Sequence, residues 1–141
     1  MFQGPHPYHV DEKGRLKLPP EFAAELGSPF TVCRGANGCL WLLPEGEWRR
    51  IADQLQAGSL LEPRVLALQR YFIGSAVSGS LDGQGRLMLP PVLREFAGVQ
   101  HEVMVVGVGP RAEIWARERW DAYDSQLSDE AIAEMARAAG L

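Results

Sequence analysis

The chain lacks the cysteine content of a secreted, disulfide-rich protein. It has two cysteines among 141 residues, Cys33 and Cys39, too few for a disulfide framework. Five residues lie between them, whereas the cysteine pairs of structural zinc sites are usually two to four residues apart. We interpret both as reduced thiols that behave as small apolar side chains on neighbouring strands. We expect no metal site, although other ligand types are present in His6, His9 and His101.

Long apolar segments are also missing. No stretch approaches the roughly 20 apolar residues that a membrane-spanning helix needs. The first residues contain Pro5 and Pro7 rather than the apolar run of a signal peptide. We therefore expect a soluble, cytoplasmic protein with no membrane partner.

Signatures of enzymes are absent too. The sequence contains no glycine-rich phosphate loop, no HExxH motif and no nucleophile elbow. Asp82-Gly83 is similar to the turn of aspartic proteases, but that chemistry needs a second aspartate of the same kind. The corresponding place in the first half of the chain holds Asp11-Glu12. We expect a protein that is not an enzyme and that holds no cofactor.

Positive charge is not in excess. Lys and Arg number 14 against 18 Asp and Glu, a net charge of −4, which argues against a protein that simply coats nucleic acid. The local distribution can override this total. Lys13, Arg15 and Lys17 alternate along one short segment, while much of the acidic excess falls on expected helices.

What the sequence does contain is an internal repeat. Residues 11–20 read DEKGRLKLPP and residues 82–91 read DGQGRLMLPP, at a constant offset of 71 residues with seven identities over ten positions. The similarity continues through a helix-like segment, a β-rich run and a Leu-Trp or Ile-Trp pair. We interpret the chain as two copies of a unit of about fifty residues. Because so small a unit buries too little surface alone, we expect the copies to pack on each other or on other subunits.

The repeat divides the chain into four expected parts. These are a first unit with its following helix (1–57), a helical linker (58–75), a second unit (76–127) and a C-terminal helix (128–141). Alternation and turn residues predict strands at 8–10, 15–18, 29–33, 39–43, 76–81, 86–89, 102–106 and 113–115. Expected helices open at Pro20, Pro44, Pro63 and Pro91, around Trp120 and after Ser128. Short strands with one short helix per unit predict an α+β fold with a small β-barrel-like core made of two halves.

Each copy of the repeat predicts a tight turn that leads into a strand. The aspartate can cap the turn through its own backbone, and the glycine supplies the positive φ that a hairpin needs. After the turn, Arg15 and Lys17 fall on one face of the strand, and Leu16 and Leu18 on the other. The turn-forming residues are Asp11, Gly14, Asp82 and Gly85.

Turn geometry does not explain why an arginine follows both turns. Arginine reads guanine edges with two hydrogen bonds and clamps phosphates, and a two-stranded hairpin fits the major groove of DNA. Arg15 and Arg86 are therefore candidate DNA-binding residues. An alternative stays open, in which each arginine is solvated or paired with a carboxylate at the surface.

The pattern of the two copies resembles a known family. Met1-Phe2-x-Gly4, His9-x-Asp11-x-Lys13-Gly14-Arg15-Leu16-x-x-Pro19 and Asp82-x-x-Gly85-Arg86-x-x-x-Pro90 are similar to MraZ, the bacterial regulators of the division and cell wall gene cluster. That family belongs to the AbrB-like transcription factors, and the resemblance covers essentially the whole chain. It implies two SpoVT/AbrB-type units that fold as one pseudo-symmetric barrel-like core with flanking helices.

The resemblance also implies a function. It implies a sequence-specific DNA-binding repressor, associated with the nucleoid, whose subunits close into a ring and bind tandem G-rich repeats in double-stranded DNA upstream of the cluster. By motif position, Arg15 is the expected base reader, Lys13 and Lys17 are expected phosphate contacts, and Arg86 is the equivalent reader in the second unit. One subunit should bind DNA weakly, and adjacent subunits on successive repeats should bind well.

Two departures from the family pattern refine these expectations. Gln84 and Met88 stand where the first unit has Lys13 and Lys17, so the second hairpin is less basic. We expect the first unit to bind DNA and the second to contribute more of the packing, with Arg86 able to pair with a carboxylate. The segment before His9 is one residue longer than usual, so the first strand can start elsewhere.

A second function class is a protein-interaction module such as a toxin-binding antitoxin, because AbrB-like folds also serve there. Antitoxins usually carry a disordered toxin-binding tail. Residues 128–141 instead read as a capped helix, with Ser128 as the N-cap, which disfavours this alternative.

Overall fold

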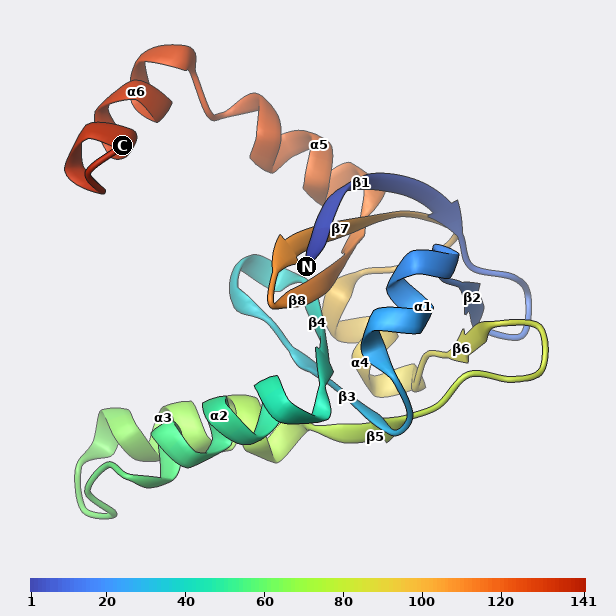
Figure 1. Cartoon of the computed structure of the whole chain (residues 1–141), viewed down its shortest axis with the longest axis horizontal. Coiled ribbons are helices and arrows are strands. Elements are labelled where there is room, and N and C mark those ends of the chain that lie inside the picture. The colour runs from blue at the N-terminus through green and yellow to red at the C-terminus, as the bar shows by residue number, and fades with distance from the viewer.

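All 141 residues are described by the structure, a computed structural model (Figure 1). Its strands are β1 (Phe2–His9), β2 (Arg15–Lys17), β3 (Phe30–Arg34), β4 (Leu40–Pro44), β5 (Val77–Gly79), β6 (Arg86–Met88), β7 (Glu102–Gly109) and β8 (Arg111–Ala116). Its α-helices are α1 (Pro20–Leu26), α2 (Glu45–Gln56), α3 (Pro63–Phe72), α4 (Pro91–Ala97), α5 (Arg117–Ser125) and α6 (Asp129–Ala138). The expected α+β class is confirmed.

The strands of the two copies are interleaved within one sheet. The six-stranded sheet has the order β1-β7-β8-β4-β3-β5, and every neighbouring pair is antiparallel. β1, β3 and β4 come from the first copy, and each pairs with a strand of the second, namely β7, β5 and β8. The remaining two strands, β2 and β6, pair with each other. The expectation that the copies pack on each other is therefore confirmed.

The expected barrel-like core is not found, because the six-stranded sheet is open at β1 and β5. β2 and β6 form a separate sheet, which single bridges at Val10–Leu16 and Leu81–Leu87 connect to the segments before each turn. Both strands are only three residues long. A Pro-Pro pair follows each of them, and proline cannot donate to a ladder. Strands this short leave no ladder that closes the sheet.

The first strand is longer than the sequence predicts. We expected an irregular start and a strand only around residues 8–10, because of Pro5 and Pro7, but β1 runs from Phe2 to His9. β1 is an edge strand that pairs only with β7. An edge strand tolerates proline because one side of its backbone needs no partner.

The two copies share one apolar core. Twenty buried residues form this cluster, and equivalent residues of both copies belong to it, among them Leu16 with Leu87 and Phe22 with Leu93. A smaller cluster of four residues, Trp115 among them, lies apart from the main one. Trp120 of α5 packs edge-on against Trp115, with the ring centroids 5.5 Å apart.

Local chemistry fixes where the helices begin. Proline stands in the first turn of α1, α3 and α4, where its missing N–H removes no helical hydrogen bond. The Ser128 side chain accepts a hydrogen bond from the Ala131 N–H at 3.1 Å and begins α6, as predicted. α6 extends away from the sheet (Figure 1), and its apolar side chains Ile132 and Met135 are exposed. None of the helices has the length and apolar character needed to cross a membrane.

Candidate nucleic-acid interface

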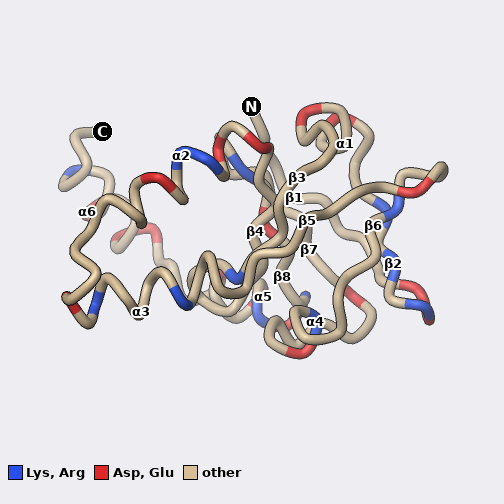
Figure 2. Tube along the Cα trace, turned by 90° about the horizontal axis from the view of Figure 1, so that it is seen from below, with Lys and Arg blue, Asp and Glu red and all other residues tan.

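The β2–β6 ladder places the repeated arginines on one surface. Its antiparallel register pairs Arg15 with Met88 and Lys17 with Arg86, with the two central leucines opposite each other. Those leucines are buried, so the alternation of a strand directs the four flanking side chains outward. Figure 2 shows the blue positions of β2 and β6 at the end of the molecule opposite α3 and α6. The structure thus brings together Arg15, Lys17 and Arg86, which the sequence separates by up to 71 residues.

The first turn has the geometry that its sequence predicts. The Asp11 N–H donates to the Arg15 carbonyl at 2.9 Å, and the Gly14 N–H donates to the Asp11 carbonyl at 3.0 Å. The Asp11 side chain accepts, through Oδ1, the N–H groups of Lys13 and Arg15, each at 2.9 Å. Gly14 has φ of +82°, a value that favours glycine. The prediction of a capped tight turn is confirmed.

The second turn repeats this geometry. Oδ1 of Asp82 accepts the N–H groups of Gln84 at 2.9 Å and Arg86 at 3.0 Å, and Gly85 has φ of +76°. The backbone of the turn is therefore the same whether its tip carries a lysine (Lys13) or a glutamine (Gln84).

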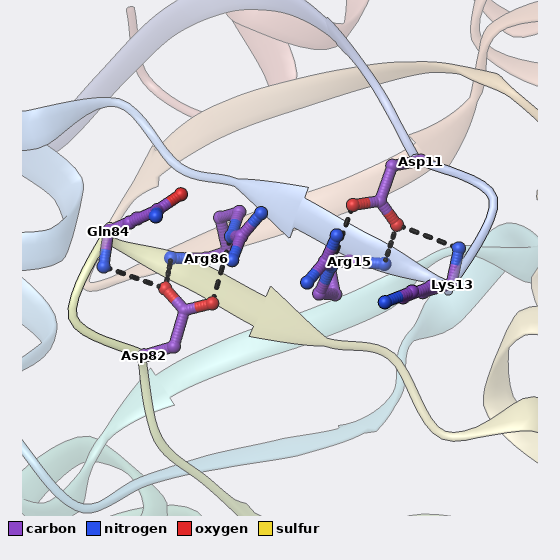
Figure 3. A network of polar contacts seen from close by, with 6 residues as sticks. All are labelled: Asp11, Lys13, Arg15, Asp82, Gln84 and Arg86. Carbon is purple, nitrogen blue, oxygen red and sulfur yellow. Dashed lines mark hydrogen bonds and ion pairs between the residues drawn. The ribbon is translucent and has the colours of Figure 1, made fainter.

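Each aspartate also holds the arginine of its own turn (Figure 3). Arg15 Nε donates to Asp11 Oδ2 at 2.7 Å, and Arg86 Nε donates to Asp82 Oδ2 at 2.8 Å. We expected carboxylate pairing as an alternative, and as a special property of Arg86 in the second unit. The structure shows it for both arginines, so this ion pair does not distinguish the two turns.

The ion pairs leave the outer nitrogens of both arginines available. Only Nε of each guanidinium makes a hydrogen bond in the structure, and the side chains of Arg15 and Arg86 are 27% and 25% exposed. One fixed Nε restricts the guanidinium to a single orientation. The two Nη groups, which form the fork that binds a guanine edge or a phosphate, can then meet a ligand without further ordering.

The two carboxylates are stabilised as anions. The backbone N–H of Arg15, followed by its guanidinium, lowers the pKa of Asp11 below its usual value of 3.8. The backbone N–H of Arg86 has the largest effect in lowering the pKa of Asp82. At neutral pH the positive charge of each arginine is therefore balanced by the negative carboxylate of the aspartate in its own turn.

Net charge differs between the two turns. Residues 11–17 contain three cations and two anions, a net charge of +1, whereas residues 82–88 contain one of each and are neutral. The excess at the first turn resides on Lys13 and Lys17, which hold no carboxylate at salt-bridge distance. Arg15 and the second turn line one shallow hollow of about 230 Å³, with Asp82, Arg86 and Met88 among its other residues.

Sequence reasoning missed the second role of the aspartates. We assigned Asp11 and Asp82 to turn formation only, whereas each also orients an arginine. The signal was present as an Asp-x-x-x-Arg spacing that occurs in both copies.

The cysteines lie away from this surface. Cys33 and Cys39 are fully buried and unpaired, as apolar side chains would be. Burial raises the pKa of the Cys33 thiol to about 12 and raises that of Cys39 further. No cluster of three or more His, Cys, Asp or Glu side chains in the structure could hold a metal ion.

The sequence is similar to known proteins along nearly its whole length. It matches the model of the MraZ protein family, described as antitoxin-like, twice, over residues 1–71 and 72–140. It is 38% identical to a transcriptional regulator MraZ of Heliobacterium modesticaldum, and 40% identical to those of Syntrophomonas wolfei and Moorella thermoacetica. Each of these similarities spans 136 residues, or 95% of this chain and 95% of the relative.

Proposed function

The chain belongs to the MraZ family, as the two copies of its Asp-x-x-Gly-Arg motif predicted, and on that basis we propose that it regulates transcription by binding duplex DNA through the outward face of the β2–β6 ladder. The relatives described above are named transcriptional regulators. The family also agrees with the expectation that the protein is not an enzyme.

One observation carries this proposal, namely the pairing of β2 with β6. It places Arg15, Lys17 and Arg86 on the same face of a two-stranded ribbon. A ribbon of this kind fits the major groove, which is about 12 Å wide. The aspartate of each turn holds its arginine by Nε, so the side chain is oriented before DNA arrives.

The arginines and the lysines have different roles in recognition. Arg15 reads a base edge through its two Nη groups, and Arg86 does the same from the second turn. Lys13 and Lys17 bind phosphates, which positions the ribbon but carries no sequence information. The first turn therefore supplies most of the electrostatic attraction, because its residues alone carry a net positive charge.

The finer biological role follows from the family resemblance and from this charge. The protein acts as a repressor of the division and cell wall gene cluster, and a ring of its subunits binds tandem repeats in the promoter. A net charge of −4 per chain, with only +1 at the first turn, supports the ring, because a single subunit attracts DNA weakly. Several linked contacts multiply such weak affinities.

The test is a binding titration at several salt concentrations on the DNA upstream of the protein's own gene. The wild type is compared with Arg15→Ala, Arg86→Ala and the control Arg117→Ala, which changes a partly exposed arginine paired with Asp121 on α5. Loss of one bidentate base contact weakens specific binding by about 1–3 kcal/mol, or roughly 5- to 150-fold, for each contact. The control should bind like the wild type.

The outcomes separate the candidate functions. If Arg15→Ala binds as well as the wild type, Arg15 does not read a base, and the result for Arg86→Ala decides whether the ladder is involved. If the wild type shows no specific binding, the antitoxin-like alternative becomes the better account. The exposed apolar side chains of α6, Ile132 and Met135, would then be the first place to seek a protein partner.

A further inference from the structure

Arg94 belongs to α4 of the second copy but lies against the turn of the first. A Cβ atom built on Gly14 would lie 2.8 Å from Arg94 Nη1, so the guanidinium occupies the space beside that glycine. Gly14 is buried although it belongs to a tight turn at the surface. The equivalent Gly85 has no atom within 4 Å of the same position. The first turn is therefore covered by an arginine, and the second is not.

The guanidinium of Arg94 has no acceptor in the chain. Its Nε is buried without a hydrogen-bond partner and is the one buried side-chain polar atom of which this is true. Arg15 and Arg86 donate to carboxylates, and Arg119 donates to the carbonyls of Gly38 and Phe96. A partly buried cation without an acceptor is unfavourable, so an anion that meets the outer nitrogens of this guanidinium would stabilise it.

The pseudo-symmetry of the chain shows how unusual this arginine is. The offset of 71 residues that relates the copies places Ala23 in α1 where α4 has Arg94. The same comparison sets Lys13 against Gln84 and Lys17 against Met88. In all three places the first turn gains a cation that the second turn lacks. These three differences between the copies all add positive charge at the first turn. They point to one ligand, a polyanion that approaches this turn.

We propose that Arg94 is a DNA-backbone contact, which binds a phosphate oxygen beside the first turn together with Lys13. The inference rests on the proposed function, because it requires the ladder to face DNA. It makes the first turn a composite site, with Lys13 and Lys17 from one copy and Arg94 from the other. The second turn then contributes Arg86 and little further charge.

Salt dependence distinguishes a phosphate contact from a structural brace. Each phosphate contact that is lost reduces the slope of log K against log salt concentration by about 0.9 for duplex DNA. We would measure this slope for the wild type, Arg94→Gln, Arg94→Lys, the benchmark Lys13→Gln and the control Arg70→Gln. Arg70 is exposed on α3, a helix that Figure 2 shows on the other side of the large sheet from the ladder.

We expect Arg94→Gln to lower the slope as much as Lys13→Gln, whatever number of subunits the DNA engages, since both residues occur once per chain. Arg94→Lys keeps the charge and should keep the slope, as should Arg70→Gln. In the Arg94→Gln background, Ala23→Arg places the cation beside the second turn, where Gly85 leaves space, and should restore the slope.

A weaker affinity with an unchanged slope would make Arg94 a brace for the turn rather than a phosphate contact. An unchanged affinity would give it no role in binding. Thermal unfolding of Arg94→Gln shows whether this variant has a folding defect. If it has one, the slope for Arg94→Lys decides between the two roles, since a phosphate contact predicts that lysine keeps the slope. If Lys13→Gln lowers the slope and Arg94→Gln does not, only this inference fails. If the wild type does not bind DNA specifically, the proposed function fails with it.

Discussion

Two glycines in identical turns should respond differently to the same substitution. Gly14 and Gly85 have φ of +82° and +76°, so alanine is strained at both places. They differ in their surroundings, because Gly14 is buried and Gly85 is not, and because an added methyl group would meet different neighbours. At Gly85 it would enter open space, and at Gly14 it would lie 2.8 Å from Arg94 Nη1. Gly14→Ala should therefore destabilise the protein more than Gly85→Ala.

The magnitudes follow from the backbone and from the displaced side chain. A left-handed conformation disfavours a non-glycine residue by about 1–2 kcal/mol, which is the expected loss for Gly85→Ala. At Gly14 the end of the Arg94 side chain must also shift, because Nη1 lies within van der Waals overlap of the added methyl group. Pushing a flexible side chain off its preferred rotamer adds about 0.5–1.5 kcal/mol. We expect a difference of about 1 kcal/mol between the two variants.

Urea denaturation followed by the fluorescence of the four tryptophans measures this difference. The slope of unfolding free energy against urea should stay constant, so a change in midpoint reports stability. A double-mutant cycle supplies the control: in an Arg94→Ala background, Gly14→Ala should be no more destabilising than Gly85→Ala. Equal effects of the two glycine substitutions in the wild type, or no coupling between Gly14 and Arg94, would refute the reasoning.

Three further predictions concern other parts of the molecule. The carboxyl of Asp11 should titrate below its usual pKa of 3.8, as seen by NMR of its side chain. Its stabilising contribution is then present above that pH and is lost as the pH falls through the lowered value, so Asp11→Asn should unfold with less dependence on acid. Cys33 and Cys39 should react with a thiol reagent at pH 8 only when the protein unfolds, because burial raises the pKa of Cys33 to about 12 and that of Cys39 further, and rapid reaction of the native protein would contradict their burial. Ser128→Ala should weaken the start of α6 by about 1 kcal/mol, seen as faster amide exchange in that helix, while DNA binding stays unchanged; a loss of binding would give α6 a part in recognition.

The sequence predicted those features that depend on neighbouring residues. The turns were correct because Asp11 bonds only to groups two to four residues further along the chain. The helix starts were correct because proline and Ser128 act within one turn. The start of β1 was wrong because the tolerance of Pro5 depends on the position of β1 at the edge of the sheet. Local patterns carry no information about whether a strand will lie at the edge of a sheet, with one side of its backbone unpaired.

The candidate site was predictable residue by residue but not as a surface. The motif indicated Arg15 and Arg86, and the spacing from each aspartate could have indicated the ion pairs. The pairing of β2 with β6, which unites the two arginines, joins residues about 70 positions apart. The position of Arg94 beside Gly14 depends in turn on where α4 packs, so no spacing in the sequence reveals it.

The pairing of strands between the copies makes the chain resemble a dimer whose two subunits are joined in one polypeptide. A polypeptide with one copy would keep the β3–β4 pair, but β1 and the outer sides of β3 and β4 would lack the partners that the second copy supplies. It would have to find a second molecule to complete its sheet. Its folding would then depend on its concentration, as it does for obligate dimers. Joining the copies in one chain keeps the second at a high effective concentration near the first. The fusion also permits the halves to diverge, so that a cation can be kept at one turn and omitted from the other, which two identical subunits could not do.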